Sequence, residues 1–199
     1  MKKSLLIILG IALTFGLSAQ VRFGVKLGGT LSQLSNKVEG ESENSDPKIG
    51  FQVGGLLEYS FSESFALQPE LLYVNNGGKF GGGESEDVVF NLHNIQLPVN
   101  LKYKLGTDKL KFYVTGGPYL GYIAAARLSA GAVSINVFDD DAGTDMKHFD
   151  FGVGAGFGIE LSNKYVAGVG YQYGLANLTG SEGAKMKSGT FNLSIGYLF

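Results

Sequence analysis

Beyond residue 20, hydrophobic and polar residues alternate with a period of two along most of the chain. A period of two places successive side chains on opposite faces, so it predicts β-strands with two different surfaces. The alternation is cleanest at the end of the chain, where every second residue is apolar, namely Phe191, Leu193, Ile195, Tyr197 and Phe199. Eight segments show it, and they cover 21–31, 48–61, 65–75, 93–105, 110–127, 149–161, 165–176 and 191–199.

The chemistry of the two faces distinguishes a soluble fold from a membrane one. Eight strands could form a soluble sandwich or barrel with the apolar side inward, or a membrane barrel with the apolar side outward. Here the apolar face is large and aromatic, whereas the polar face carries glycine, amide and charged residues. A narrow barrel interior needs small side chains, and a lipid-facing surface needs Leu, Val, Phe and Tyr. The pattern therefore favours the membrane barrel.

Segment lengths and connections point the same way. A tilted strand needs about 9–11 residues to cross a bilayer, which these segments reach, whereas strands of soluble proteins more often have about 5–6. Tight turns are expected at 61–64, 105–109 and 161–164, and longer loops at 32–47, 76–87, 128–147 and 177–186. Short periplasmic turns and longer outer loops are typical of outer-membrane barrels. We therefore predict an all-β fold, an eight-stranded antiparallel up-and-down transmembrane β-barrel.

The first residues have the pattern of a secretory signal peptide. Two lysines precede the uncharged apolar run 4–17, and Ala19 provides a small residue before the expected cleavage bond. The run is shorter than the ~20 residues that a spanning helix needs, which disfavours a retained anchor. We expect a cleaved signal peptide at 1–19 and an outer-membrane β-barrel domain at 20–199.

Composition and charge exclude several classes of protein. The chain has no cysteine, which excludes disulfides, thiolate zinc sites and a cysteine nucleophile. With 16 Lys+Arg against 18 Asp+Glu, it lacks the basic excess of a nucleic-acid-binding protein. The 31 glycines follow no G-X-Y period, so the chain is not collagen-like. We expect no nucleic-acid partner.

Four segments of the chain carry a family resemblance. They are LQPELLYVNNGG at 67–78, HNIQLPVNLKY at 93–103, FYVTGGPYLGY at 112–122 and GVGYQYGLANL at 168–178. These segments resemble the recurring segments of the PorT-type outer-membrane β-barrel family. The resemblance covers essentially the whole mature chain and implies an exported, eight-stranded barrel of a Gram-negative envelope. It brings no catalytic residues and no cofactor, and the family takes its name from a member linked to protein secretion.

Charged and amide side chains collect on the inward face of the predicted barrel. Because bare charges in so narrow an interior are costly, we expect Glu58, Glu70 and Glu160 to pair with basic or amide neighbours. The interior could be a proton or ion path or a structural polar plug, and the plug is favoured because eight strands leave no open channel. The inward set is Arg22, Lys26, Gln52, Glu58, Gln68, Glu70, Gln96, Asn100, Lys102, Lys111, Asp150, Glu160 and Gln172, with Arg22, Lys26, Lys102 and Lys111 as the basic partners.

Acidic residues gather in the outer loops. Asp139, Asp141 and Asp145 could hold Ca²⁺ or Mg²⁺, which could bridge to lipopolysaccharide phosphates. The EF-hand spacing fails, because Thr144 stands where its glycine should be. A solvated acidic loop is the favoured interpretation, since charge runs are usually solvated. We therefore predict no bound metal and no cofactor.

The two histidines bear on whether the chain is an enzyme. A His–Ser pair that cuts acyl chains from lipid A needs the nucleophile within hydrogen-bond reach of its base. His93 shares the strand parity of Ile95 and should face lipid, whereas His148 shares the parity of Asp150 and should face inward. The two cannot serve one site, and we predict that the chain is not an enzyme.

The sequence thus favours an integral outer-membrane protein with a structural, adhesive or docking role and no open pore. An accessory component of a protein-secretion or envelope-assembly machine is the alternative, and a lipid A-modifying enzyme ranks third. The expected partners are outer-membrane lipids, lipopolysaccharide, the barrel-assembly machinery and envelope or secretion proteins. The assembly machinery would bind the last strand, with its five alternating apolar residues ending at Phe199, as an exposed strand edge.

Overall fold

The computed structural model describes residues 21–38, 41–81, 88–130, 133–137, 147–179 and 184–199. These residues form ten β-strands and no helix. The strands are β1 (Val21–Val38), β2 (Glu41–Asn44), β3 (Lys48–Ser60), β4 (Phe65–Phe80), β5 (Val88–Thr107), β6 (Leu110–Ala130), β7 (Val133–Asn136), β8 (Phe149–Leu161), β9 (Tyr165–Gly174) and β10 (Ala184–Leu198).

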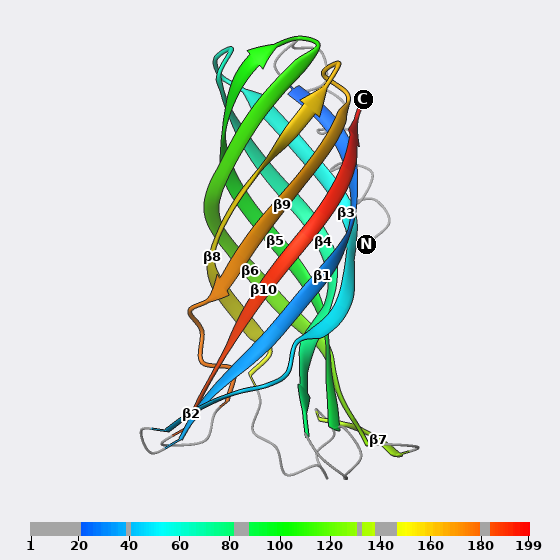
Figure 1. The fold of residues 1–199 in the computed structure, drawn as a ribbon, viewed down its shortest axis with the longest axis vertical. Helices are drawn as coiled ribbons and strands as arrows, with labels where there is room; N and C mark the ends of the chain where they lie inside the picture. The colour runs from blue at the N-terminus through cyan, green and yellow to red at the C-terminus, as the bar shows by residue number, and fades with distance from the viewer. Residues whose placement is uncertain (1–20, 39–40, 82–87, 131–132, 138–146, 180–183) are drawn as a thin grey trace, which may run out of the picture.

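Eight of these strands close into a single antiparallel ring (Figure 1). The order is β10-β9-β8-β6-β5-β4-β3-β1, and β10 pairs with β1 to close the ring, from Gly24 opposite Leu198 to Val38 opposite Ala184. The amide of Phe199 adds a final bond to the carbonyl of Phe23 at 2.8 Å. The predicted eight-stranded up-and-down barrel is confirmed.

The outer surface of the ring is apolar, as the alternation predicts. Leu193 on β10 is 65% exposed and Phe157 on β8 is 64% exposed, whereas Glu58 and Glu160 on the inward face are fully buried. The tight turns β3–β4, β5–β6 and β8–β9 lie at one end of the barrel, called here the turn end, and the longer connections lie at the other, the loop end. Aromatic contacts lie near the turn end, where Tyr197 packs edge-on against Tyr165. A polar interior behind an apolar, aromatic-bordered surface is the arrangement of a membrane barrel.

Inward glycines on β8 and β9 make room for a large side chain inside the ring. Gly158 and Gly168 are register partners, and a Cβ added to either would lie within 2.5 Å of the Tyr113 hydroxyl. The phenol therefore occupies the space that side chains at these positions would fill. The glycine content of these strands reflects this filling of a narrow barrel.

Several strands run farther than the sequence pattern predicted. The expected loops 32–47, 76–87, 128–147 and 177–186 contain the ends of β1, β4 and β6, the start of β10 and the short strands β2 and β7. In Figure 1, β2 and β7 lie on opposite sides of the end remote from the C-terminus, where β2 pairs with β1 and β7 pairs with β6.

The physical reason is that the alternation reverses near this loop end. Leu34 and Leu92 point inward and are 1% exposed, while Gln33, the outward residue next to Leu34, is polar and exposed. A prediction that requires the apolar residues to face outward therefore ends these strands before their true ends.

An apolar cluster fills the lumen at the loop end. Its buried members come from β1, β5, β6 and the segments that follow β7 and β9. They are Leu34, Phe90, Leu92, Ile123, Ala126, Val137, Ala176 and Leu178, with Phe80 and Met186 packed against them. At the loop end the barrel therefore has an apolar core, as a water-soluble β-barrel does.

Candidate functional site

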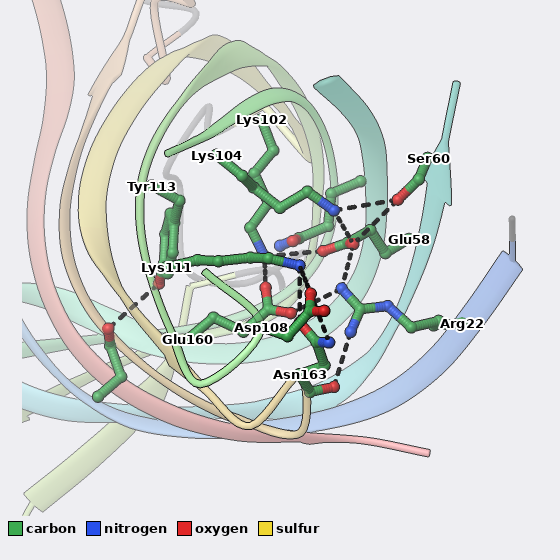
Figure 2. Close-up of polar contacts among 12 residues, drawn as sticks. Arg22, Glu58, Ser60, Lys102, Lys104, Asp108, Lys111, Tyr113, Glu160 and Asn163 are labelled. Carbon is green, nitrogen blue, oxygen red and sulfur yellow. Dashed lines mark hydrogen bonds and ion pairs between the residues drawn. The ribbon is translucent and has the colours of Figure 1, made fainter. Parts of the chain in front are cut away.

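The turn end of the lumen holds a network of buried charges (Figure 2). Lys102 is fully buried, and its ammonium lies 2.7 Å from Glu58 and 3.1 Å from Glu160. Arg22 contacts the same two carboxylates, and Lys104 lies 2.8 Å from Glu58. These five residues come from β1, β3, β5 and β8, and every ion pair except Arg22–Glu58 crosses the lumen between strands that are not neighbours.

The network has one more positive than negative charge, with three cations around two carboxylates. Each carboxylate oxygen of Glu58 and Glu160 accepts from at least one ammonium or guanidinium group. Charge-assisted bonds of this kind are the strong ones in a low-dielectric interior. The arrangement holds its charges in place rather than offering them to a passing ion.

Two members of this end of the lumen escaped the sequence analysis. Lys104 is buried and pairs with Glu58, but it is absent from the predicted inward set. Asn163 lies in a predicted turn and adopts φ 58°, a left-handed conformation that Asn tolerates well. Its backbone carbonyl accepts from Arg22 at 2.7 Å, and its side-chain oxygen accepts from Lys111 at 2.8 Å. Strand parity does not apply to turn residues. Only the preference of Asn for turns could have predicted a role for Asn163.

Lys111 does not reach the three glutamates, contrary to the expected pairing. Its ammonium contacts Asp108 at 3.1 Å and Asn163, because its position near the start of β6 puts it at the rim. The Asn163 amide and then Lys111 hold the pKa of the exposed Asp108 carboxyl below its usual value. Lys111 therefore belongs to the turn region rather than to the buried network.

A second, smaller pair lies deeper in the lumen. Lys26 contacts Glu70 at 2.8 Å, and Gln68 donates to the other oxygen of Glu70 at 2.6 Å. Both groups border a cavity of about 60 Å³ that is also lined by Gln52 and Asn100. A polar cavity of this size has room for a few water molecules but is no channel.

The loop carboxylates cannot be placed, because Asp139, Asp141 and Asp145 lie outside the described residues. Within the described part, Asp46 pairs its backbone with that of Lys79 in an isolated bridge.

The histidines lie on the outer surface. His93 Nδ1 and the Tyr73 hydroxyl form a hydrogen bond. His93 lies on the outward side of β5, as strand parity predicts. His148 was expected to face inward, but it is exposed and stacks on Tyr122 with ring centroids 5.6 Å apart. The parity argument fails there because His148 precedes the first residue of β8.

The last strand presents its alternating apolar face outward. Phe191, Leu193, Ile195 and Phe199 are all at least 60% exposed, and Tyr197 packs between two aromatic rings on the same face. This is the surface that the expected assembly signal would offer.

Comparisons with known proteins give the same fold. The chain matches the family model described as outer membrane protein beta-barrel domain over residues 16–180. No curated protein matches the chain. No described residue belongs to a helix long and apolar enough to cross a membrane.

Three solved structures are similar to the chain. OprG from Pseudomonas aeruginosa is 14% identical with a TM-score of 0.55, over 89% of this chain and 95% of OprG. Neisserial surface protein A (NspA) is 15% identical with a TM-score of 0.50, over 89% of this chain and 97% of NspA. Ail, the attachment invasion locus protein of Yersinia pestis, is 16% identical with a TM-score of 0.49, over 90% of this chain and 99% of Ail. At such identities the likeness to OprG and NspA shows the fold alone.

Proposed function

The chain belongs to the outer membrane protein beta-barrel domain family, and from this premise we propose that it is a non-conducting, non-catalytic barrel with a docking, adhesive or structural role. The observation that carries the proposal is the filling of the lumen at both ends. Export through a cleaved signal peptide, with the turns in the periplasm and the long connections outside the cell, belongs to the same proposal.

The two fillings differ in chemistry and lie at different depths. At the turn end the charged network bridges the lumen through Lys102, whose two carboxylate partners lie on β3 and β8. At the loop end the cluster around Leu92 and Ile123 is apolar and buried. An ion would have to displace paired charges at one end and cross an apolar layer at the other, and both steps are costly.

The strands that continue past the apolar belt support a role in docking. An outer-membrane strand needs about 9–11 residues to span the bilayer, and β5 and β6 have 20 and 21. The surplus lies at the loop end, where β2 and β7 each pair with one strand of the ring. Such strand edges can add a partner's strand through backbone hydrogen bonds.

Planar-bilayer recording tests the closed lumen. The purified full-length protein should give no steady conductance, and a double variant Lys102→Ala/Glu160→Ala, which removes side chains from the network, serves as the comparison. A stable ohmic current through the unaltered protein would refute the non-conducting role.

The resemblance to the PorT-type family favours a second candidate, an accessory component of a secretion or envelope-assembly machine. Co-purification from detergent-solubilised outer membrane separates the two, because a machine component should bring stoichiometric envelope proteins with it. A docking protein should bring surface-exposed or extracellular partners, or lipopolysaccharide. Mass spectrometry of lipid A from a deletion strain tests the third candidate, and an altered acylation pattern would favour the enzyme.

A further inference from the structure

Three oxygen atoms in the lumen lack a hydrogen-bond donor among the described residues. They are Asn94 Oδ1, Gln96 Oε1 and Asp150 Oδ1. Asn94 and Gln96 are 2% exposed and Asp150 is 4% exposed, so bulk water does not reach them. A buried acceptor without a donor costs about 1–3 kcal/mol, and more when it is charged. Three such acceptors in one region call for a shared ligand.

Two of these side chains flank one glycine of the barrel wall, and the third lies beside them on the same strand. Gln96 on β5 and Asp150 on β8 are both register partners of Gly121 on the intervening β6. A Cβ at Gly121 would lie 3.5 Å from the Asp150 Cβ and 3.6 Å from the Gln96 Cγ, so the glycine leaves the space between them open. Asn94 lies two residues from Gln96 on the same inward face, directly after a shift in the β5–β6 register. Bulges of this kind re-aim side chains and are over-represented next to functional sites.

The other oxygen of Asp150 is already engaged. Oδ2 accepts from the Tyr119 hydroxyl at 3.1 Å and from Ser188 Oγ at 3.2 Å. These two donors come from β6 and β10 and fix the orientation of the carboxylate, which leaves Oδ1 free to contact a ligand. No ion pair of the described residues includes Asp150. An ionised Asp150 would therefore be buried without a cationic side chain beside it.

We propose that Asn94, Gln96 and Asp150 bind a monovalent alkali cation, Na⁺, inside the lumen. Carboxylate and amide oxygens are ligands for hard cations, and the three orphaned atoms are all of this type. One carboxylate with two neutral amides carries a charge of −1, which Na⁺ neutralises, whereas a divalent ion would leave a buried charge of +1. Water would leave the carboxylate charge uncompensated. A proton on Oδ1 would neutralise it but could donate to only one of the two amide oxygens.

Refolding in detergent with different cations tests the site. The urea midpoint should rise with the logarithm of Na⁺ concentration when NaCl replaces choline chloride at constant ionic strength, because choline is too large to bind among these oxygens, whereas Na⁺ binds the folded state. Asp150→Asn should remove this dependence, and its new amide group can donate to Gln96 Oε1 in place of the ion. Asp108→Asn, at the exposed turn, is the matched control and should keep the full dependence. A wild-type midpoint that ignores Na⁺ but shifts with pH would overturn the proposal in favour of a protonated Asp150.

A diffraction measurement on the unaltered protein keeps the proposal testable if Asp150→Asn does not fold. Crystals grown in NaCl should show a density peak in contact with Asp150 Oδ1 and the two amide oxygens that is absent from crystals grown in choline chloride. No peak in the lumen, or a peak on other residues, would overturn the assignment.

Discussion

Glu58 is the residue whose removal should disturb the barrel most. It is fully buried and accepts from Arg22, from Lys102 at 2.7 Å and from Lys104 at 2.8 Å. Glu58→Gln keeps the size of the side chain but leaves three cations with the single carboxylate of Glu160, so the net charge of the network rises from +1 to +2. Breaking a buried ion pair by removing one partner costs about 3–5 kcal/mol.

The assay is urea unfolding in detergent, followed by the change in gel mobility between folded and heat-unfolded protein. At a urea dependence of about 2 kcal/mol per M, a loss of 3–5 kcal/mol lowers the midpoint by roughly 1.5–2.5 M. The matched control is Glu63→Gln, which removes the same charge from an exposed turn and should leave the midpoint almost unchanged.

A compensating variant separates charge imbalance from lost packing. Lys104 has Glu58 as its carboxylate partner, so Glu58→Gln/Lys104→Met restores the net charge of +1. Replacing a whole buried pair is often near neutral, so the double variant should recover most of the lost midpoint. The reasoning is refuted if Glu58→Gln unfolds at the same urea concentration as Glu63→Gln, or if the second substitution lowers the midpoint further.

Three further predictions follow from the same structure. Glu70→Gln should lower the urea midpoint more than Glu63→Gln, because it breaks the Lys26 pair inside the lumen; equal midpoints would place Glu70 in water. Deleting Phe199 should leave a refolded barrel intact in detergent but reduce the folded fraction recovered from cells, and normal recovery from cells would contradict its role as an assembly signal. Because the chain has no cysteine, Gln33→Cys should react with a membrane-impermeant maleimide on whole cells while Leu31→Cys stays protected; the reverse result would misplace the bilayer boundary.

The eight-stranded membrane barrel could be predicted from the alternation together with the lengths of the segments and of their connections. Residues such as Leu193 and Phe157 face outward, and Glu58 and Glu160 face inward, because a strand has only two faces and parity assigns each residue to one of them. What parity cannot assign is the partner across the lumen. That depends on strand tilt and on how far each side chain reaches, which is why Lys111 was paired with the wrong groups.

The ends of the strands could not be predicted for a different reason. Parity fails for residues outside the ladder, as His148 and Asn163 show. It also fails where the environment outside the barrel changes from lipid to water. Beyond that point Gln33 faces out and Leu34 faces in, so the same strand carries the opposite pattern.

This reversal explains why the two ends of the lumen are filled with different chemistry. Within the bilayer, the apolar residues of each strand face the lipid, so the interior receives the polar ones and must satisfy them with specific partners such as Lys102 between Glu58 and Glu160. Above the bilayer, water surrounds the barrel and apolar side chains gain by pointing inward, as Leu92 and Ile123 do. The orphaned oxygens of Asn94, Gln96 and Asp150 lie where these two regimes meet, next to the apolar cluster along β5. At that depth neither paired side chains nor an apolar core neutralises Asp150, and a small cation supplies the compensation that both regimes leave out.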